Sequence, residues 1–126
     1  MPSKQLYQKQ LIGFKNEFSE LSKIYESQNI PSGLILYGKK GIGKKTFIFH
    51  LINYLLSKNE SGQYNLKDKI IDTSSATYKL TVNGVHPNLF VVEKKEDKKT
   101  IDILQIREMF NFARKSTFDN KLKFIV

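Results

Sequence analysis

One stretch decides the fold: Gly38-Lys39-Lys40-Gly41-Ile42-Gly43-Lys44-Lys45-Thr46. A short apolar run, Leu34-Ile35-Leu36-Tyr37, precedes this stretch, and a long segment with apolar residues at helical spacing, Phe47 to Leu56, follows it. A strand, a glycine-rich turn and a helix, in that order, build a phosphate-binding loop. We therefore predict a phosphate loop at residues 38–46.

The glycines and the first lysine after them fit the pattern G-x-x-x-x-G-K. Glycines at 38, 41 and 43 allow successive backbone N–H groups to turn inward, and the following helix points its positive dipole end at the same place. Lys44 occupies the position from which an ammonium group reaches terminal phosphates. The candidate phosphate-binding residues are Gly38, Gly41, Ile42, Gly43, Lys44, Lys45 and Thr46.

The pattern breaks directly after Lys44. A hydrolysing phosphate loop carries Ser or Thr at the next position, where the hydroxyl binds Mg²⁺, but this chain has Lys45 there. Thr46 comes one residue later, which is a large rotation around a helix axis. The sequence thus predicts a loop for ATP, another nucleotide or phosphate, and it argues against Mg²⁺ and hydrolysis, so no residue is assigned as catalytic. The alternative is a solvated turn that happens to match the pattern.

Composition restricts the class of protein. The chain has 126 residues, 40% hydrophobic and 26% charged, which suits one small globular domain or a piece of a larger one. No apolar run approaches the length of a membrane span, and the first residues lack the apolar core of a signal peptide. The absence of cysteine excludes disulfides and cysteine-based zinc sites. These features predict a cytoplasmic protein with no membrane partner and no zinc.

The net charge is strongly positive, +9, from 21 Lys and Arg against 12 Asp and Glu. A basic surface can indicate nucleic acid or another polyanion as a partner. The lysines are spread along the chain, however, and Arg107 and Arg114 are the only arginines. A lysine-rich proteome explains this distribution better than a nucleic-acid-binding surface does.

The periodicity of apolar residues predicts alternating helices and strands. We expect a helix over 11–30 ending near Gln28, a buried strand at Leu34 to Tyr37, and a helix from Lys44 to about Lys58 with His50 packed near its apolar face. The polar stretch 59–83 should contain short elements only, followed by a strand at Leu89 to Val92 and a charged loop at Lys94 to Lys99. The chain should then form a helix at about 104–115, a turn at Asp119-Asn120 and a strand at Leu122 to Val126. This order predicts an α/β fold with a parallel sheet.

Several segments occur in the same order as in a known family. They are Leu11-Ile12-Gly13, Gly38-x-x-Gly41-Ile42-Gly43-Lys44-x-Thr46, His86-Pro87-Asn88-Leu89, Ile103-x-x-Ile106-Arg107-Glu108 and Ser116-Thr117-Phe118-x-x-x-Leu122-Lys123-Phe124-Ile125-Val126. In this order the chain resembles the delta-prime subunits of the bacterial DNA polymerase III clamp loader. The resemblance covers nearly the whole chain, and it rests on the ordered set because no single motif is specific.

The resemblance implies that residues 1–126 are the N-terminal part of an AAA+ P-loop ATPase-type domain, without lid and collar domains. It also implies that a strand beyond Val126 lies between the strands at 34–37 and 122–126, so that the sheet is incomplete here. The implied function is to help load the sliding clamp onto primed DNA during replication. The implied partners are the gamma/tau and delta subunits, with the clamp and primed DNA reached through the assembled complex.

Lys45 fits delta-prime subunits, which often keep the shape of the loop without ATPase activity, better than it fits gamma/tau subunits. The cysteine cluster that follows the loop helix in many clamp-loader subunits is absent, and a polar stretch from Asn59 replaces it. The alternative is an active P-loop ATPase subunit similar to gamma/tau. Whether the chain is an enzyme stays open between these two readings, and we expect no ATPase activity from this chain itself.

Overall fold

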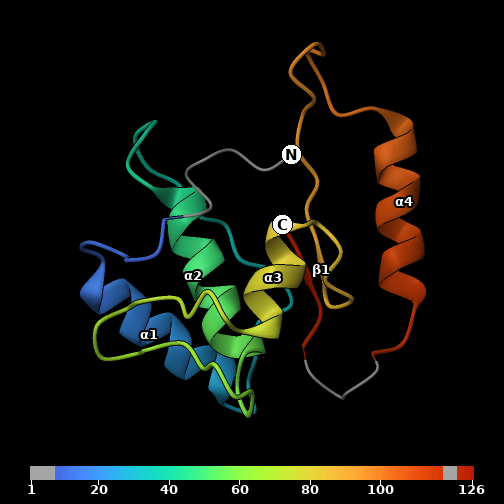
Figure 1. The fold of residues 1–126 in the computed structure, drawn as a ribbon. Helices are drawn as coiled ribbons and strands as arrows, with labels where there is room; N and C mark the ends of the chain where they lie inside the picture. Colours follow the sequence, from blue (N-terminus) through green and yellow to red (C-terminus); the bar gives the residue numbers. More distant parts are fainter. Residues whose placement is uncertain (1–7, 118–121) are drawn as a thin grey trace.

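The computed structural model describes residues 8–117 and 122–126. Its elements are, in order, α1 (Lys15–Glu26), α2 (Lys44–Leu56), α3 (Ala76–Val82), β1 (Leu89–Phe90), α4 (Ile103–Arg114) and β2 (Phe124–Ile125). Figure 1 shows α2 between α1 and α3, and α4 standing beside β1. This mixture of helices with a small parallel sheet is compatible with the predicted α/β class. The turn predicted at Asp119-Asn120 lies outside the described residues.

The central element is α2, which is buried on almost every side. Its buried residues are Thr46, Phe47, Phe49, His50, Leu51, Ile52, Asn53, Leu55 and Leu56. Helix α1 packs against one side of α2 and α3 against another, which explains why so few of its side chains reach solvent. The predicted helix is confirmed, and it ends two residues before the predicted Lys58. Because α2 is fixed by the core, the loop that precedes it has a rigid support.

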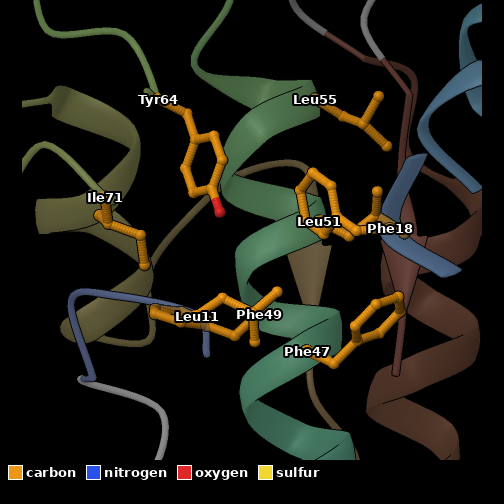
Figure 2. Close-up of a cluster of buried hydrophobic side chains, with 8 residues drawn as sticks. All are labelled: Leu11, Phe18, Phe47, Phe49, Leu51, Leu55, Tyr64 and Ile71. Atoms are coloured by element: carbon orange, nitrogen blue, oxygen red, sulfur yellow. The ribbon is translucent and has the colours of Figure 1, made fainter. Parts of the chain in front are cut away.

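An aromatic cluster forms the middle of the core. The ring of Phe18 on α1 stacks on Tyr64 at a centroid distance of 5.8 Å and meets Phe47 of α2 edge-on at 5.9 Å. Figure 2 shows the eight buried side chains of this core, which are Leu11, Phe18, Phe47, Phe49, Leu51, Leu55, Tyr64 and Ile71. Each fully buried large apolar side chain contributes about 1.5–3 kcal/mol to the stability of the fold.

Helix α1 is shorter than the predicted 11–30, because the chain before it cannot continue a right-handed helix. Gly13 and Phe14 have φ values of 81° and 55°, in the left-handed region. Leu11 instead donates its N–H to the Lys69 carbonyl at 2.9 Å, alongside an isolated antiparallel bridge. At the other end, Ser27 is extended and stops the helix after Glu26.

The polar stretch 59–83 contains one short helix, α3, whose start looked like loop sequence. Ser75 is the N-cap of α3, and its side-chain oxygen accepts the N–H of Tyr78 at 3.0 Å. The Thr77 hydroxyl donates to the carbonyl of Leu56 at 3.2 Å, which ties α3 to the end of α2. Short serine-rich segments are therefore capping signals here as well as loop signals.

The two strands predicted at 89–92 and 122–126 are confirmed as a short parallel pair. Leu89 lies opposite Phe124 and Phe90 opposite Ile125. The Phe124 N–H donates to the Asn88 carbonyl at 2.8 Å, and the Val126 N–H donates to the Phe90 carbonyl at 2.9 Å. The charged segment after β1, residues 94–99, is exposed as predicted.

The prediction of a strand at Leu34–Tyr37 is wrong. The run is not paired with any strand among the described residues, and Ile35 and Tyr37 are 86% and 92% exposed. Only Leu36 packs against the core. A β-ladder needs a neighbouring strand to accept and donate its backbone hydrogen bonds, so apolar composition alone does not make this run a strand. Among the described residues, no helix is long and apolar enough to cross a membrane.

Candidate functional site

The predicted loop is a tight turn that runs directly into α2. Gly41 and Gly43 have φ values of 82° and 102°, a region that favours glycine, and the Ile42 N–H donates to the Lys39 carbonyl at 3.3 Å. Gly43 is the N-cap of α2 and supplies no side-chain cap, and the first turn of α2 contains no acidic residue. The positive end of the helix dipole therefore meets no side-chain oxygen from its own cap.

Lys44 folds back over this turn. Its Nζ donates to the Gly38 carbonyl at 2.7 Å and to the Lys39 carbonyl at 3.1 Å. These two hydrogen bonds hold the ammonium group over the turn that the glycines form. The arrangement keeps a positive charge beside the turn.

Lys45 points to another part of the chain. Its Nζ lies 3.1 Å from Oε2 of Glu93, the third residue after β1, and this ion pair is largely exposed. Glu93 was not among the residues singled out from the sequence. The signal that could have found it is its place just beyond a strand of a parallel sheet, where functional side chains gather in α/β folds.

The remaining predicted residues divide between the surface and the interior. Ile42 is 49% exposed at the tip of the turn, whereas Thr46 is only 6% exposed and packs inside the fold. The side chain of Ile42 lies beside Gly38, where an added Cβ would make only ordinary van der Waals contact with its Cγ2, at 3.6 Å. The structure thus brings Gly38, Gly41, Gly43 and Lys44 together and turns Thr46 away.

Lys44 lines two hollows beside the loop. One of about 290 Å³ is lined by Phe14, Tyr37, Ile42 and Lys44 among others. The other, of about 570 Å³, lies between residues 30–36 and β2, and both Lys44 and Lys45 line it. The two ammonium-bearing side chains of the first turn of α2 therefore border one groove. We call the second hollow the lysine groove.

The loop is cationic. Four lysines, at 39, 40, 44 and 45, fall within seven residues, and the sequence from 38 to 59 contains no Asp or Glu. Glu93 is the carboxylate paired with one of them. Clustered lysines beside curved backbone N–H groups attract anions and repel divalent cations.

The side chains at the loop do not fit a magnesium site. Mg²⁺ requires oxygen ligands in nearly octahedral geometry. The position that should supply a hydroxyl carries an ammonium group, Thr46 is buried, and the nearby carboxylate of Glu93 is neutralised by Lys45. No group of three or more His, Cys, Asp or Glu side chains in residues 8–117 and 122–126 could hold a metal ion.

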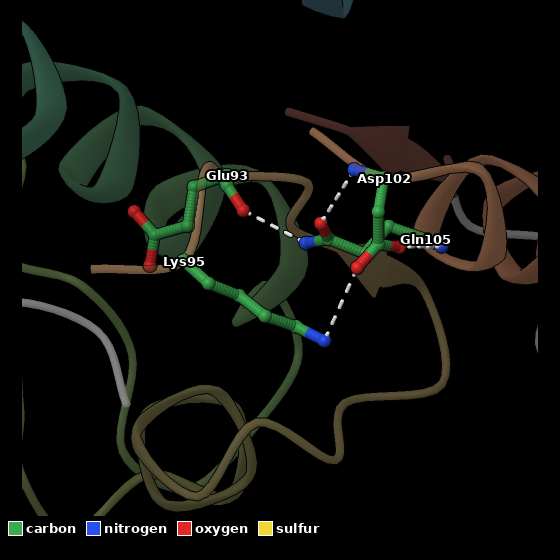
Figure 3. Close-up of polar contacts among 4 residues, drawn as sticks. All are labelled: Glu93, Lys95, Asp102 and Gln105. Carbon is green, nitrogen blue, oxygen red and sulfur yellow. Dashed lines mark hydrogen bonds and ion pairs between the residues drawn. The ribbon is translucent and has the colours of Figure 1, made fainter. Parts of the chain in front are cut away.

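Glu93 also connects the loop helix to α4 through its backbone. Its carbonyl accepts a hydrogen bond from Nε2 of Gln105 at 2.8 Å (Figure 3). Gln105 and Asp102 form a capping box at the start of α4, and Lys95 pairs with Asp102 at 3.4 Å. The backbone N–H of Gln105 lowers the pKa of the Asp102 carboxyl, with a smaller contribution from Lys95.

His50 is confirmed as a packed histidine. It is fully buried on α2, and its ring nitrogens contact the Tyr64 hydroxyl and the Gln8 carbonyl, each at 2.8 Å. Burial lowers the pKa of His50 below its usual 6.5, while the bond to Gln8 opposes this shift. A neutral imidazole in the core with both nitrogens paired is a structural group.

Residues 13–126 match the protein family described as DNA polymerase III, delta subunit. The chain belongs to this family. Membership connects the chain with DNA polymerase III, with replication and with clamp-loader-type function. The match covers the loop and every helix and strand in the part of the chain that the structure describes. No curated protein matches the chain.

Proposed function

We propose that the chain is a delta-prime-like subunit of the DNA polymerase III clamp loader, whose loop at 38–46 holds a nucleotide or another phosphate anion without hydrolysing it. The assignment of residues 1–126 to an AAA+ P-loop domain belongs to this proposal. Family membership supports the clamp-loader role. The observation that supports the absence of hydrolysis is that sequence position 45, where the motif has a magnesium-binding hydroxyl, carries a lysine whose ammonium pairs with Glu93.

Phosphoryl transfer needs a metal ion that bridges the phosphates, an oriented water molecule and a cation that stabilises the transition state. The loop provides the glycine turn and Lys44, which suffice to bind an anion. It provides no oxygen ligand for the metal. Binding and catalysis are therefore separable in this chain, and the proposed role of the loop is structural.

ATP turnover tests the catalytic half of the proposal. The purified chain, alone and mixed with delta and gamma/tau subunits, is assayed with ATP and Mg²⁺. We expect the chain alone to show only background turnover, and we expect Lys44→Ala to change the turnover of neither sample. Mg²⁺-dependent turnover by the chain alone that Lys44→Ala abolishes would contradict the proposal and favour an active, gamma/tau-like ATPase.

Assembly tests the other half. We expect the chain to co-purify with delta and gamma/tau subunits, and to reach the sliding clamp and primed DNA through that complex. By itself, a chain of charge +9 should bind DNA without sequence preference, and this binding should weaken steeply with salt. Tight, sequence-selective DNA binding by the isolated chain at physiological salt would overturn the clamp-loader role.

A further inference from the structure

Lys45 occupies the sequence position where the motif has a magnesium-binding hydroxyl. It therefore removes a metal ligand and also adds a second positive charge next to Lys44. Lys45 stands in the first turn of α2, and its side chain borders the lysine groove together with Lys44. Because Lys44 and Lys45 line the same groove, the Lys45 ammonium can contribute to binding an anion held there once its ion pair with Glu93 opens.

The ion pair between Lys45 and Glu93 can be broken easily. The ion pair with Glu93 has side-chain exposures of 58% and 38%, and exposed pairs of this kind contribute little to stability. Among the described residues, Lys44 is likewise held by two neutral carbonyl oxygens of its own loop. Both ammonium groups can therefore turn to a polyphosphate. Its several negative charges attract them more strongly than a single carboxylate or two neutral carbonyls do.

We propose that this loop binds a metal-free polyphosphate, with the Lys45 ammonium supplying the positive charge that a divalent cation supplies in hydrolysing loops. The inference rests on the anion-binding function proposed above. A polyphosphate that already carries Mg²⁺ has less negative charge and brings a hydrated cation toward Lys45. Mg²⁺ and Lys45 then compete for the same phosphate oxygens, so the metal weakens binding.

The test is calorimetric titration of the full chain with ATP at constant ionic strength, once in EDTA and once with Mg²⁺ in excess. We expect Mg²⁺ to weaken the binding of ATP by about tenfold, as for the loss of one strong charge interaction. In Lys45→Thr, which restores a hydroxyl, we expect ATP to bind equally well or better with Mg²⁺. In Glu93→Gln, which frees Lys45, we expect metal-free ATP to bind more tightly than to the wild type.

Lys40→Ala is the matched control, because it removes one loop lysine that does not border the lysine groove. It should keep the unfavourable effect of Mg²⁺. This inference is overturned if the wild type binds Mg–ATP more tightly than metal-free ATP, or if Mg²⁺ has an equal effect on the wild type and on Lys45→Thr. Neither result contradicts the proposed anion-binding function. If the wild type and Lys44→Ala bind ATP equally, or neither binds it, the proposed anion-binding function fails and the inference fails with it.

Discussion

The hydroxyl of Tyr64 lies 2.8 Å from Nδ1 of His50, at the centre of the core. Because Nε2 of His50 faces the Gln8 carbonyl, which can only accept, Nε2 carries the ring proton and Nδ1 accepts from Tyr64. This pair joins α2 to the polar stretch that follows it. Since the loop leads directly into α2, this pair helps to hold the candidate site in place.

Lowering the pH should destabilise the fold through His50. Burial lowers its pKa in the folded state below the usual 6.5 of the unfolded chain. The unfolded state therefore binds more protons, so the free energy of unfolding is unaffected by His50 above pH 6.5 and falls as the pH drops below it. Urea melts between about pH 7.5 and 5.5 measure this slope. His50→Gln should be less stable at neutral pH but should lose this part of the slope, and an unchanged slope would rule out His50 as its source.

Removing the Tyr64 hydroxyl should weaken the core. Tyr64→Phe leaves Nδ1 of His50 buried without its donor, which costs about 1–3 kcal/mol. Chemical denaturation at neutral pH reports the loss. Tyr37→Phe is the control because Tyr37 is 92% exposed, and it should leave stability unchanged. Equal effects of the two substitutions would mean that the hydrogen bond contributes nothing.

Anion binding at the loop should depend on Lys44 more than on Lys39. Lys44→Ala removes the ammonium held above the turn and should weaken binding of ATP or tripolyphosphate by about tenfold or more. Lys39 contributes only its carbonyl to this arrangement, so Lys39→Ala should have a small effect. Titration calorimetry compares the two variants. Equal losses at both positions would show that diffuse lysine charge attracts the anion and that the loop is no specific cradle.

Glycine is required at residue 43 for its backbone conformation. With φ at 102°, any side chain there is strained, so Gly43→Ala should lower stability by about 1–2 kcal/mol. Gly33→Ala is the matched control, since a Cβ at Gly33 meets nothing within 4 Å and its φ lies outside the left-handed region. It should change stability by less than about 0.5 kcal/mol. Thermal melts of both variants decide whether the cost is specific to the loop.

The exposed run 34–37 should make the 126-residue chain self-associate. Ile35 and Tyr37 are 86% and 92% exposed, and neighbouring exposed apolar side chains favour association between copies of a chain. Ile35→Lys should shift the chain toward monomer in sedimentation velocity runs at increasing concentration. Val85→Lys changes another exposed apolar residue, 62% exposed just beyond the turn that follows α3, and should leave association as it is. A monomeric wild type with a sharp two-state unfolding transition would contradict the prediction.

Local pattern predicted the loop and the helix after it, because glycine spacing and apolar periodicity act over a few residues. The apolar periodicity from Phe47 onward predicted the helix in which Phe47 is buried, and the glycines predicted a turn before it. The pairing of Lys45 with Glu93 joins residues 48 positions apart, and no short-range signal specifies such a partner. The same limit applies to Tyr64, whose contact with His50 depends on how the polar stretch folds back.

The errors of prediction have the same origin. The run 34–37 has the composition of a strand, but strand formation depends on a partner strand that composition does not reveal. Helix α1 was predicted too long because Phe14 fits the helical period, whereas its φ of 55° places it in the turn before the helix. The expectation of only short elements in the stretch 59–83, by contrast, agrees with α3, which Ser75 caps.

Helix α4 has no buried residue, unlike α2. It is attached through the hydrogen bond from Gln105 to the Glu93 carbonyl and through the ring of Phe112, whose centroid lies 5.4 Å from that of Phe90. The Lys123 ammonium lies over the Phe112 ring and donates to the Phe112 and Lys115 carbonyls. A helix held by so few contacts can open on its own while the α1–α2–α3 core stays folded. Its amide protons would then exchange with solvent much sooner than those of α2. The molecule thus consists of a slowly exchanging centre that bears the loop and a marginal helix at its side.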